Sequence, residues 1–322
     1  MIAGPRPGGC VFDTRGQVDR RRSGRRFASV ALVLAAAVVG ACSPSVSGPR
    51  PGAEGPFRYV SLGDSYVSGP LLPEPYGEPI DCGRSRTNWP AQVARAIDAR
   101  QFIDASCGSA KSIHMTEEQR APLGSKTRPQ FEALTPDTDL VTIGVGGNDV
   151  GFDGLAKGCV NLLPFPLGDA PWGRPCIQKN VFGSWDKTSW KIEQARPKVT
   201  AVLAGIIERA PAARVILVGY PVAFPDSGVG CWPQVPILDV DVKYLRDKYR
   251  EMNQMLADAA QSQGVEFVDA YTPSIGHDVC QPYPNAWVNT INLDPPGLPL
   301  HPNIYSHNRT AQAVTAAIVA GP

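Results

Sequence analysis

The stretch from Tyr59 to Gly69 reads YVSLGDSYVSG, and it decides how this chain is organised. Its first four residues form a short apolar run with the length of a buried strand, and Gly63 ends that run at a tight turn. The turn carries Ser65, which would therefore lie at the carboxyl end of a strand. Ligands bind at that edge of open α/β sheets, where a hydroxyl can approach a substrate carbonyl. The alternative is a capping serine, because Asp and Ser both bind free N–H groups at a helix start.

Strand and helix patterns alternate along the rest of the chain. We expect strands at 102–106, 140–145, 215–219 and 265–268, and helices at 88–99, 191–209, 239–263 and 308–319. Parallel strands need right-handed crossovers, which place helices on both faces of a sheet. The chain from about residue 57 onward is therefore expected to be one α/β domain, a three-layer sandwich around a five-stranded parallel sheet.

Composition excludes some classes of function. The 31 Lys and Arg nearly balance the 30 Asp and Glu, whereas nucleic-acid binding needs a concentrated basic surface. With four His and no CxxC pair, the chain gives little support for a zinc site, and we expect no metal or cofactor. The GxSxG signature of α/β-hydrolases is absent because Val67 replaces its last glycine. Asp149 likewise replaces the last glycine of a dinucleotide-binding GxGxxG motif.

The first 42 residues are typical of an export signal. Arginines at 20–22, 25 and 26 precede an uncharged stretch, Phe27 to Ala41, whose apolar part is too short to span a bilayer. Small residues before Cys42 resemble a bacterial lipobox, which implies a cell envelope lipoprotein anchored to the membrane by a lipid on Cys42. The alternative is an ordinary signal and a secreted protein. Residues 43–56, rich in Ser, Pro and Gly, are expected to form a flexible tether.

Six cysteines remain once Cys10 is removed and Cys42 is taken as the lipid site: Cys82, Cys107, Cys159, Cys176, Cys231 and Cys280. An even set of cysteines in an oxidising compartment implies disulfides. The cysteine count alone leaves their pairing open.

Three motifs together resemble the GDSL, or SGNH, hydrolase family. They are GDS at 63–65, GGND at 146–149 and HPN at 301–303, in the order and approximate spacing of that family. CGRS at 82–85, SC at 106–107, GYP at 219–221 and GHDVC at 276–280, followed by Trp287, resemble its actinobacterial secreted branch. The resemblance implies a flavodoxin-like fold and three sequential disulfides, Cys82 with Cys107, Cys159 with Cys176, and Cys231 with Cys280.

The same resemblance implies roles for individual residues. Ser65 would be the nucleophile and His301 the general base. The Asn148 amide, the Ser65 N–H and an N–H of the loop after the second strand would form the oxyanion hole. We therefore expect a monomeric serine esterase or lipase acting on acyl esters.

Two positions depart from the family pattern. The family has Asp three residues before the catalytic His, where this chain has Leu298. We expect the backbone carbonyl of Leu298 to hold the imidazole, with Asp294 as the rival. In the oxyanion loop, Ser109 stands where the branch has Gly, and either Gly108 or Ser109 could supply the N–H.

Two other functions stay open at this point. The same residues could transfer or remove acyl or acetyl groups on envelope glycans. Alternatively, a binding lipoprotein could keep the fold without turnover, which the missing Asp favours. Tryptophans in long insertions could line an acyl pocket or fill a satellite core; they are Trp172, Trp185, Trp190, Trp232 and Trp287.

Overall fold

The computed structural model describes residues 57–165, 167–169, 171–290 and 295–321. The predicted export signal and tether, residues 1–56, lie outside the described residues, and so does Asp294. Within the described ranges, none of the helices combines the length and the apolar character needed to cross a membrane.

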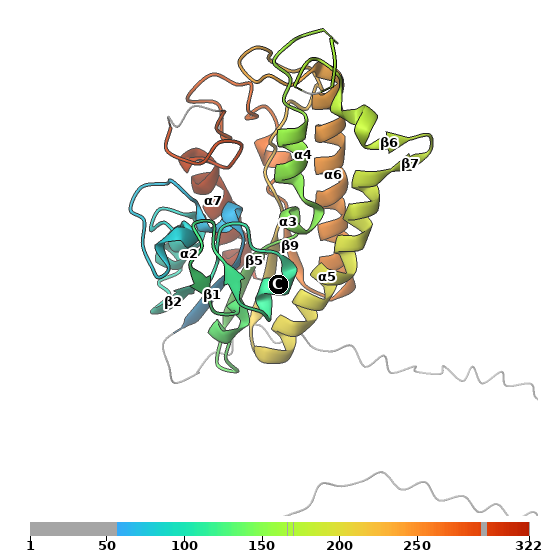
Figure 1. Ribbon diagram of the computed structural model, residues 1–322. Coiled ribbons are helices and arrows are strands. Elements are labelled where there is room, and N and C mark those ends of the chain that lie inside the picture. Colours follow the sequence, from blue (N-terminus) through green and yellow to red (C-terminus); the bar gives the residue numbers. More distant parts are fainter. Residues whose placement is uncertain (1–56, 166, 170, 291–294, 322) are drawn as a thin grey trace, which may run out of the picture. The chain divides into compact units, whose positions relative to one another are not determined.

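The described residues form a five-stranded parallel sheet in the order β2-β1-β5-β8-β9 (Figure 1). Its strands are β1 (Arg58–Gly63), β2 (Gln101–Asp104), β5 (Leu140–Gly144), β8 (Arg214–Val218) and β9 (Glu266–Val268). β1 lies between its two neighbours, with Tyr59 opposite Phe102 on one side and Leu140 on the other. The predicted parallel sheet is confirmed, and its first strand occupies an interior position.

Long helices cover both faces of the sheet. They are α2 (Trp89–Ala96), α5 (Lys187–Arg209), α6 (Asp239–Ser262) and α7 (Ile304–Ala320). Figure 1 shows α5 and α6 side by side over one face, and α2 with α7 over the other. The predicted three-layer sandwich is therefore confirmed.

Several short elements were not predicted. Three of them are short helices: α1 (Ser65–Ser68) follows β1, and α3 (Gly147–Val150) and then α4 (Phe152–Gly158) follow β5. Two antiparallel hairpins pair β3 (Gln119–Arg120) with β4 (Lys126–Thr127), and β6 (Val181–Phe182) with β7 (Trp185–Asp186). Helices of one or two turns carry too little periodicity to be recognised in a sequence.

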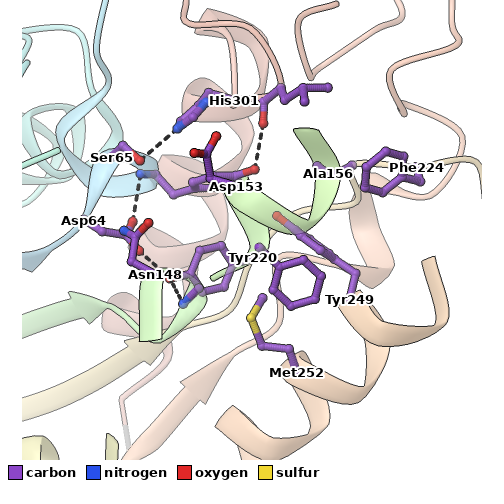
Figure 2. A pocket seen from close by; sticks show the side chains of 15 residues that line it. Asp64, Ser65, Asn148, Asp153, Ala156, Tyr220, Phe224, Tyr249, Met252 and His301 are labelled. Carbon is purple, nitrogen blue, oxygen red and sulfur yellow. Dashed lines mark hydrogen bonds between the residues drawn. The ribbon is translucent and has the colours of Figure 1, made fainter. Parts of the chain in front are cut away.

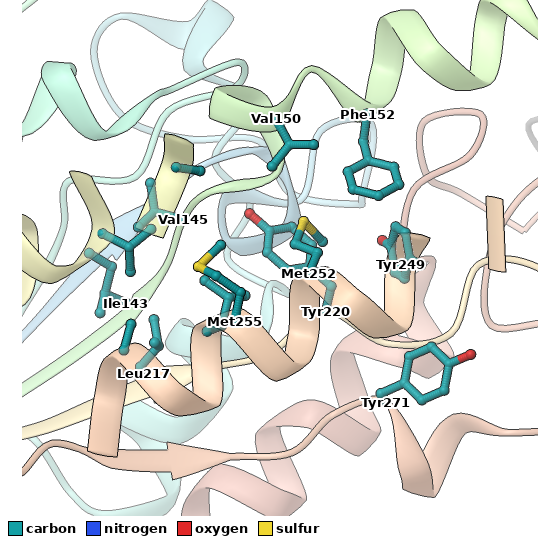
Figure 3. Packing of buried hydrophobic residues seen from close by; sticks show 14 of the residues in the cluster. Ile143, Val145, Val150, Phe152, Leu217, Tyr220, Tyr249, Met252, Met255 and Tyr271 are labelled. Atoms are coloured by element: carbon teal, nitrogen blue, oxygen red, sulfur yellow. The ribbon is translucent and has the colours of Figure 1, made fainter. Parts of the chain in front are cut away.

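The strands alternate between two cores. In β8, Val215 and Leu217 pack under α5 and α6, whereas Ile216 and Val218 face α2 and α7. All five residues of β8 are buried, because helices cover both faces of the sheet. Figure 3 shows the first core, where Met255 projects from α6 toward Leu217.

Three disulfides have the predicted pairing: Cys82–Cys107, Cys159–Cys176 and Cys231–Cys280. The first one matters for the site, because Cys107 lies in the loop after β2. The N–H of Gly108 also donates to the Cys82 carbonyl, at 2.9 Å. The disulfide and this hydrogen bond together fix the start of the loop.

Candidate active site

The GDS motif forms a sharp turn from β1 into α1. Gly63 has a φ of +144°, and a Cβ added there would lie 2.4 Å from the Gly144 carbonyl oxygen, so the position requires glycine. Asp64 caps α1, since its carboxylate accepts the Tyr66 N–H at 2.9 Å. Ser65 is the first residue of α1 and stands at the carboxyl end of a central strand.

Ser65 meets His301 at this edge, although 236 positions separate them in the chain. Ser65 Oγ lies 2.9 Å from His301 Nε2 (Figure 2). The other ring nitrogen, Nδ1, lies 2.8 Å from the Pro299 carbonyl oxygen. A carbonyl can only accept, so Nδ1 carries the proton and Nε2 offers its lone pair to the serine O–H. Burial lowers the pKa of His301, which favours the neutral imidazole needed for a base.

The contact to Nδ1 corrects the sequence-based expectation about Leu298. The Leu298 carbonyl accepts a hydrogen bond from the backbone N–H of His301, at 3.1 Å, and not from the imidazole. Leu300 adopts a φ of +58°, and the turn directs the Pro299 carbonyl to the ring instead. Asp294, the rival for this role, lies outside the described residues.

Neighbouring contacts hold the His301 loop in place. The Tyr66 hydroxyl donates to the Leu300 carbonyl at 2.8 Å, and its ring centroid lies 5.1 Å from that of the imidazole. Asn303, the last residue of HPN, caps α7 and donates to the Ala286 carbonyl at 2.8 Å. The motif therefore fixes the start of α7 two residues after the histidine.

Three N–H groups are candidates for the oxyanion hole. The Asn148 amide donates one hydrogen bond to the Ala110 carbonyl at 3.0 Å, which leaves its second N–H. The backbone N–H groups of Ser65 and Ser109 have no acceptor among the residues that the structure describes. The Gly108 N–H is bound to Cys82, so these contacts favour Ser109 over Gly108. Ser109 has a φ of +63°, the region that favours glycine.

A buried hydrogen-bond chain joins the GDS and GGND turns. The Tyr220 hydroxyl donates to the Asp64 carboxylate at 2.5 Å and accepts the Gly147 N–H at 2.9 Å. Burial raises the pKa of Asp64 to about 7, although the hydrogen bond from Tyr220 opposes this rise. Tyr220 was not predicted to belong to the site, although its place directly after a buried strand, in GYP, is a usable signal.

A mostly apolar cavity opens beside Ser65, His301 and Asn148 (Figure 2). Its apolar wall comes from α4, α6 and two loops: Phe152, Ala156, Ala223, Phe224, Met252 and Leu300. Tyr249 and Met252 were missed by the sequence analysis. They occupy one buried face of α6, and their spacing of three residues is the signal that could have found them.

The tryptophans do not line this cavity. Four of them are exposed and therefore neither line the acyl pocket nor fill a satellite core: Trp172, Trp185, Trp190 and Trp232. Trp287 is buried, and the His277 ring stacks on it with a centroid distance of 3.7 Å.

The remaining histidines bind backbone groups. The Nδ1 atoms of His114 and His307 accept the N–H groups of Lys111 and Trp89, and His277 Nδ1 lies 2.7 Å from the Asn285 carbonyl oxygen. Among the described residues, His, Cys, Asp and Glu form no group of three or more that could hold a metal ion.

Comparison with known proteins agrees with this geometry. Residues 61–308 match the GDSL-like lipase/acylhydrolase family. The chain belongs to that family. It is therefore a carboxylic ester hydrolase, and the GDS and HPN motifs both lie within the matched region.

Individual family members extend the likeness over most of the chain. Lipase 2 of Streptomyces coelicolor is 32% identical over 257 residues, which cover 79% of this chain and 83% of the relative. The crystal structure of an extracellular lipase from Streptomyces rimosus superposes with a TM-score of 0.65 and 26% identity, covering 81% of this chain and 99% of that one. A phospholipase A1 from Streptomyces albidoflavus shares the fold, with a TM-score of 0.64 and 22% identity over 81% of this chain and 98% of that one.

Proposed function

We propose that this family member is a serine esterase or lipase that hydrolyses acyl esters with Ser65 as nucleophile and His301 as general base. The observation that carries the proposal is the 2.9 Å contact between Ser65 Oγ and His301 Nε2 at the carboxyl edge of the sheet. Pro299 supports it, because a carbonyl at Nδ1 fixes the tautomer in which Nε2 can accept a proton.

In the first half of the reaction, His301 Nε2 takes the proton of Ser65 while Oγ bonds to the ester carbonyl carbon. Negative charge then develops on the carbonyl oxygen. The N–H groups of Ser65, Ser109 and Asn148 would stabilise this charge. Collapse of the tetrahedral intermediate breaks the bond to the alcohol, which leaves with the proton from His301.

The second half repeats these steps with water. His301 removes a proton from a water molecule, which attacks the carbonyl carbon of the acyl-serine. The same N–H groups again face the oxyanion. Release of the carboxylic acid returns the proton to Ser65 and restores the neutral imidazole.

We also propose that the protein is exported and anchored to the envelope through a lipid on Cys42. Three disulfides support export, because disulfides form and persist in oxidising compartments. Labelling with a fatty-acid probe should tag the full-length chain and fail in Cys42→Ser. Labelling that survives this substitution would contradict the anchor but not the hydrolase function.

The catalytic proposal is tested by Ser65→Ala, assayed with p-nitrophenyl esters and with a fluorophosphonate probe. We expect hydrolysis and labelling to be lost while the circular dichroism spectrum is unchanged. Ser68→Ala is the matched control, since Ser68 lies in the same short helix and its hydroxyl has no hydrogen-bond partner among the described residues. Full activity in Ser65→Ala would end the proposal. Acyl transfer in place of hydrolysis would show as product formation that depends on an added alcohol.

A further inference from the structure

One polar side chain of the cavity beside Ser65 is buried, is not used by the proposed mechanism and has no hydrogen-bond partner among the described residues. It is Tyr249, which projects from α6 into this mostly apolar space and is 4% exposed. Its ring packs edge-on against Phe152, at a centroid distance of 5.1 Å, and against Tyr220, at 6.2 Å. These contacts fix the direction of the phenol. Figure 2 shows its hydroxyl directed toward the side of the cavity where Asp153 and His301 lie.

The Tyr249 hydroxyl is buried without a hydrogen-bond partner among the described residues. The neighbouring phenols donate elsewhere, Tyr66 to the Leu300 carbonyl and Tyr220 to Asp64, and neither oxygen accepts a hydrogen bond from the Tyr249 hydroxyl. Burial, and after it the Tyr66 hydroxyl, raises the pKa of Tyr249 well above its usual value. The phenol therefore keeps its proton and remains a donor at any pH at which the enzyme works.

An unpartnered buried hydroxyl is costly. Leaving such a group unsatisfied typically costs about 1–3 kcal/mol, and a ligand oxygen that accepts its proton recovers much of that free energy. A site with such a donor also discriminates against ligands that lack the matching acceptor. The arrangement is therefore suited to a ligand that is apolar along most of its length and carries one oxygen.

The chemistry of the reaction indicates which part of the ester fills the cavity. The alcohol must receive a proton from His301 and depart, so it needs a route to solvent. The acyl group stays bonded to Ser65 until water attacks, and the enclosed apolar wall formed by Phe152, Phe224 and Met252 suits it.

We propose that Tyr249 is a specificity-determining residue that donates a hydrogen bond to an oxygen on the acyl chain, so that the preferred substrates are esters of keto-, hydroxy- or ether-bearing acids. This inference rests on the proposed function, since it assumes that the acyl group is bonded to Ser65. Tyr249 takes no part in the chemical steps. Its contribution should appear as discrimination between acyl chains of equal length.

The test compares p-nitrophenyl esters of pentanoic and 4-oxopentanoic acid, and of hexanoic and 5-oxohexanoic acid. Each kcat/KM is divided by the rate of hydroxide hydrolysis, which removes the intrinsic effect of the keto group. For at least one pair, the wild-type enzyme should prefer the keto ester by about tenfold or more, equivalent to about 1.4 kcal/mol. Tyr249→Phe should bring that ratio close to one while keeping or raising kcat/KM for the plain ester.

Tyr271→Phe is the matched control, because Tyr271 is a buried tyrosine of the same core that does not line the cavity. Figure 3 shows both side chains beside α6. The control should keep the wild-type ratio. Equal normalised rates for both members of each pair, or a keto preference that survives in Tyr249→Phe, would overturn the assignment and leave the hydrolase function standing. If wild-type enzyme hydrolysed none of the esters, both proposals would fall.

Discussion

The imidazole of His301 is held by the backbone carbonyl of Pro299, whose oxygen lies 2.8 Å from Nδ1. A carbonyl orients the ring and selects its tautomer, as a carboxylate does in a catalytic triad, but it brings no full negative charge. Burial at the same time lowers the pKa of His301. Burial favours a neutral imidazole in the resting enzyme, whereas the hydrogen bond to Pro299 opposes this fall in the pKa and positions the ring.

Because of this arrangement, we expect Asp294 to be dispensable for turnover. Because Pro299 already occupies Nδ1, we expect Asp294→Asn to keep kcat within about threefold of wild type, whereas a triad Asp would cost about four orders of magnitude. Steady-state kinetics with a p-nitrophenyl ester measure the difference. A loss of several orders of magnitude in a folded variant would assign the role to Asp294.

The pH dependence of kcat/KM should report His301. As the pH falls through its pKa, the imidazole is protonated and can no longer accept the Ser65 proton, so activity is lost on the acid side. Burial lowers that pKa from its ordinary value of 6.5, so the midpoint of the acid limb should lie below pH 6.5. A midpoint clearly above 6.5 would contradict this assignment.

Two exposed charged residues should shift the acid limb of the pH profile of kcat/KM in opposite directions. Asp153 favours the imidazolium and raises the pKa of His301, whereas Lys157, which lies 2.7 Å from Asp153, lowers it. Asp153→Asn should therefore shift the limb to lower pH and Lys157→Gln to higher pH. Solvent screens both charges, so each shift should be less than about one pH unit and should shrink at high salt. Shifts of the same sign would refute this account.

The contributions of the oxyanion donors can be distinguished by substitutions, because these remove a side-chain N–H but keep a backbone N–H. Asn148→Ala removes an amide N–H and should lower kcat roughly a hundredfold to a thousandfold. Ser109→Gly and Ser109→Ala keep the backbone N–H, so both should retain turnover near the wild-type level. If both Ser109 variants lost activity as Asn148→Ala does, the hydroxyl of Ser109 would be the donor.

Much of the site could be predicted because its residues follow strand ends or precede a helix. Ser65 and Asn148 come directly after apolar runs, and parallel strands bring their carboxyl ends to one edge. The partner of His301 could not be predicted in this way, because choosing Pro299 over Leu298 depends on the positive φ of Leu300, which the loop's own packing imposes. No local pattern encodes that angle.

The residues that line the cavity could not be predicted, for another reason. Tyr249 and Met252 lie on the buried face of α6, where periodicity predicts burial. Periodicity cannot distinguish a residue that faces the sheet core from one that faces a cavity at the end of the sheet. The tryptophans could not be assigned from the sequence, because large aromatic residues occur in pockets as well as in exposed insertions.

The buried carboxyl of Asp64 should make stability depend on pH. Burial raises its pKa from 3.8 to about 7 in the folded protein, so between these values the folded state keeps a proton that the unfolded chain releases. The free energy of unfolding should therefore fall as the pH rises through this window, by at most about 1.4 kcal/mol per pH unit. Asp64→Asn preserves a good helix cap, and it should reduce the decrease in the free energy of unfolding with rising pH.

Urea unfolding at several pH values between 4 and 8 measures this difference. Asp247→Asn is the control: burial opposes the shift, but hydrogen bonds and charge from Arg246 lower the pKa of Asp247, so its titration lies below the window. That variant should keep the wild-type slope. Equal slopes in wild type and Asp64→Asn would mean that Asp64 is ionised in the folded protein across the window, with the hydrogen bond from Tyr220 outweighing burial.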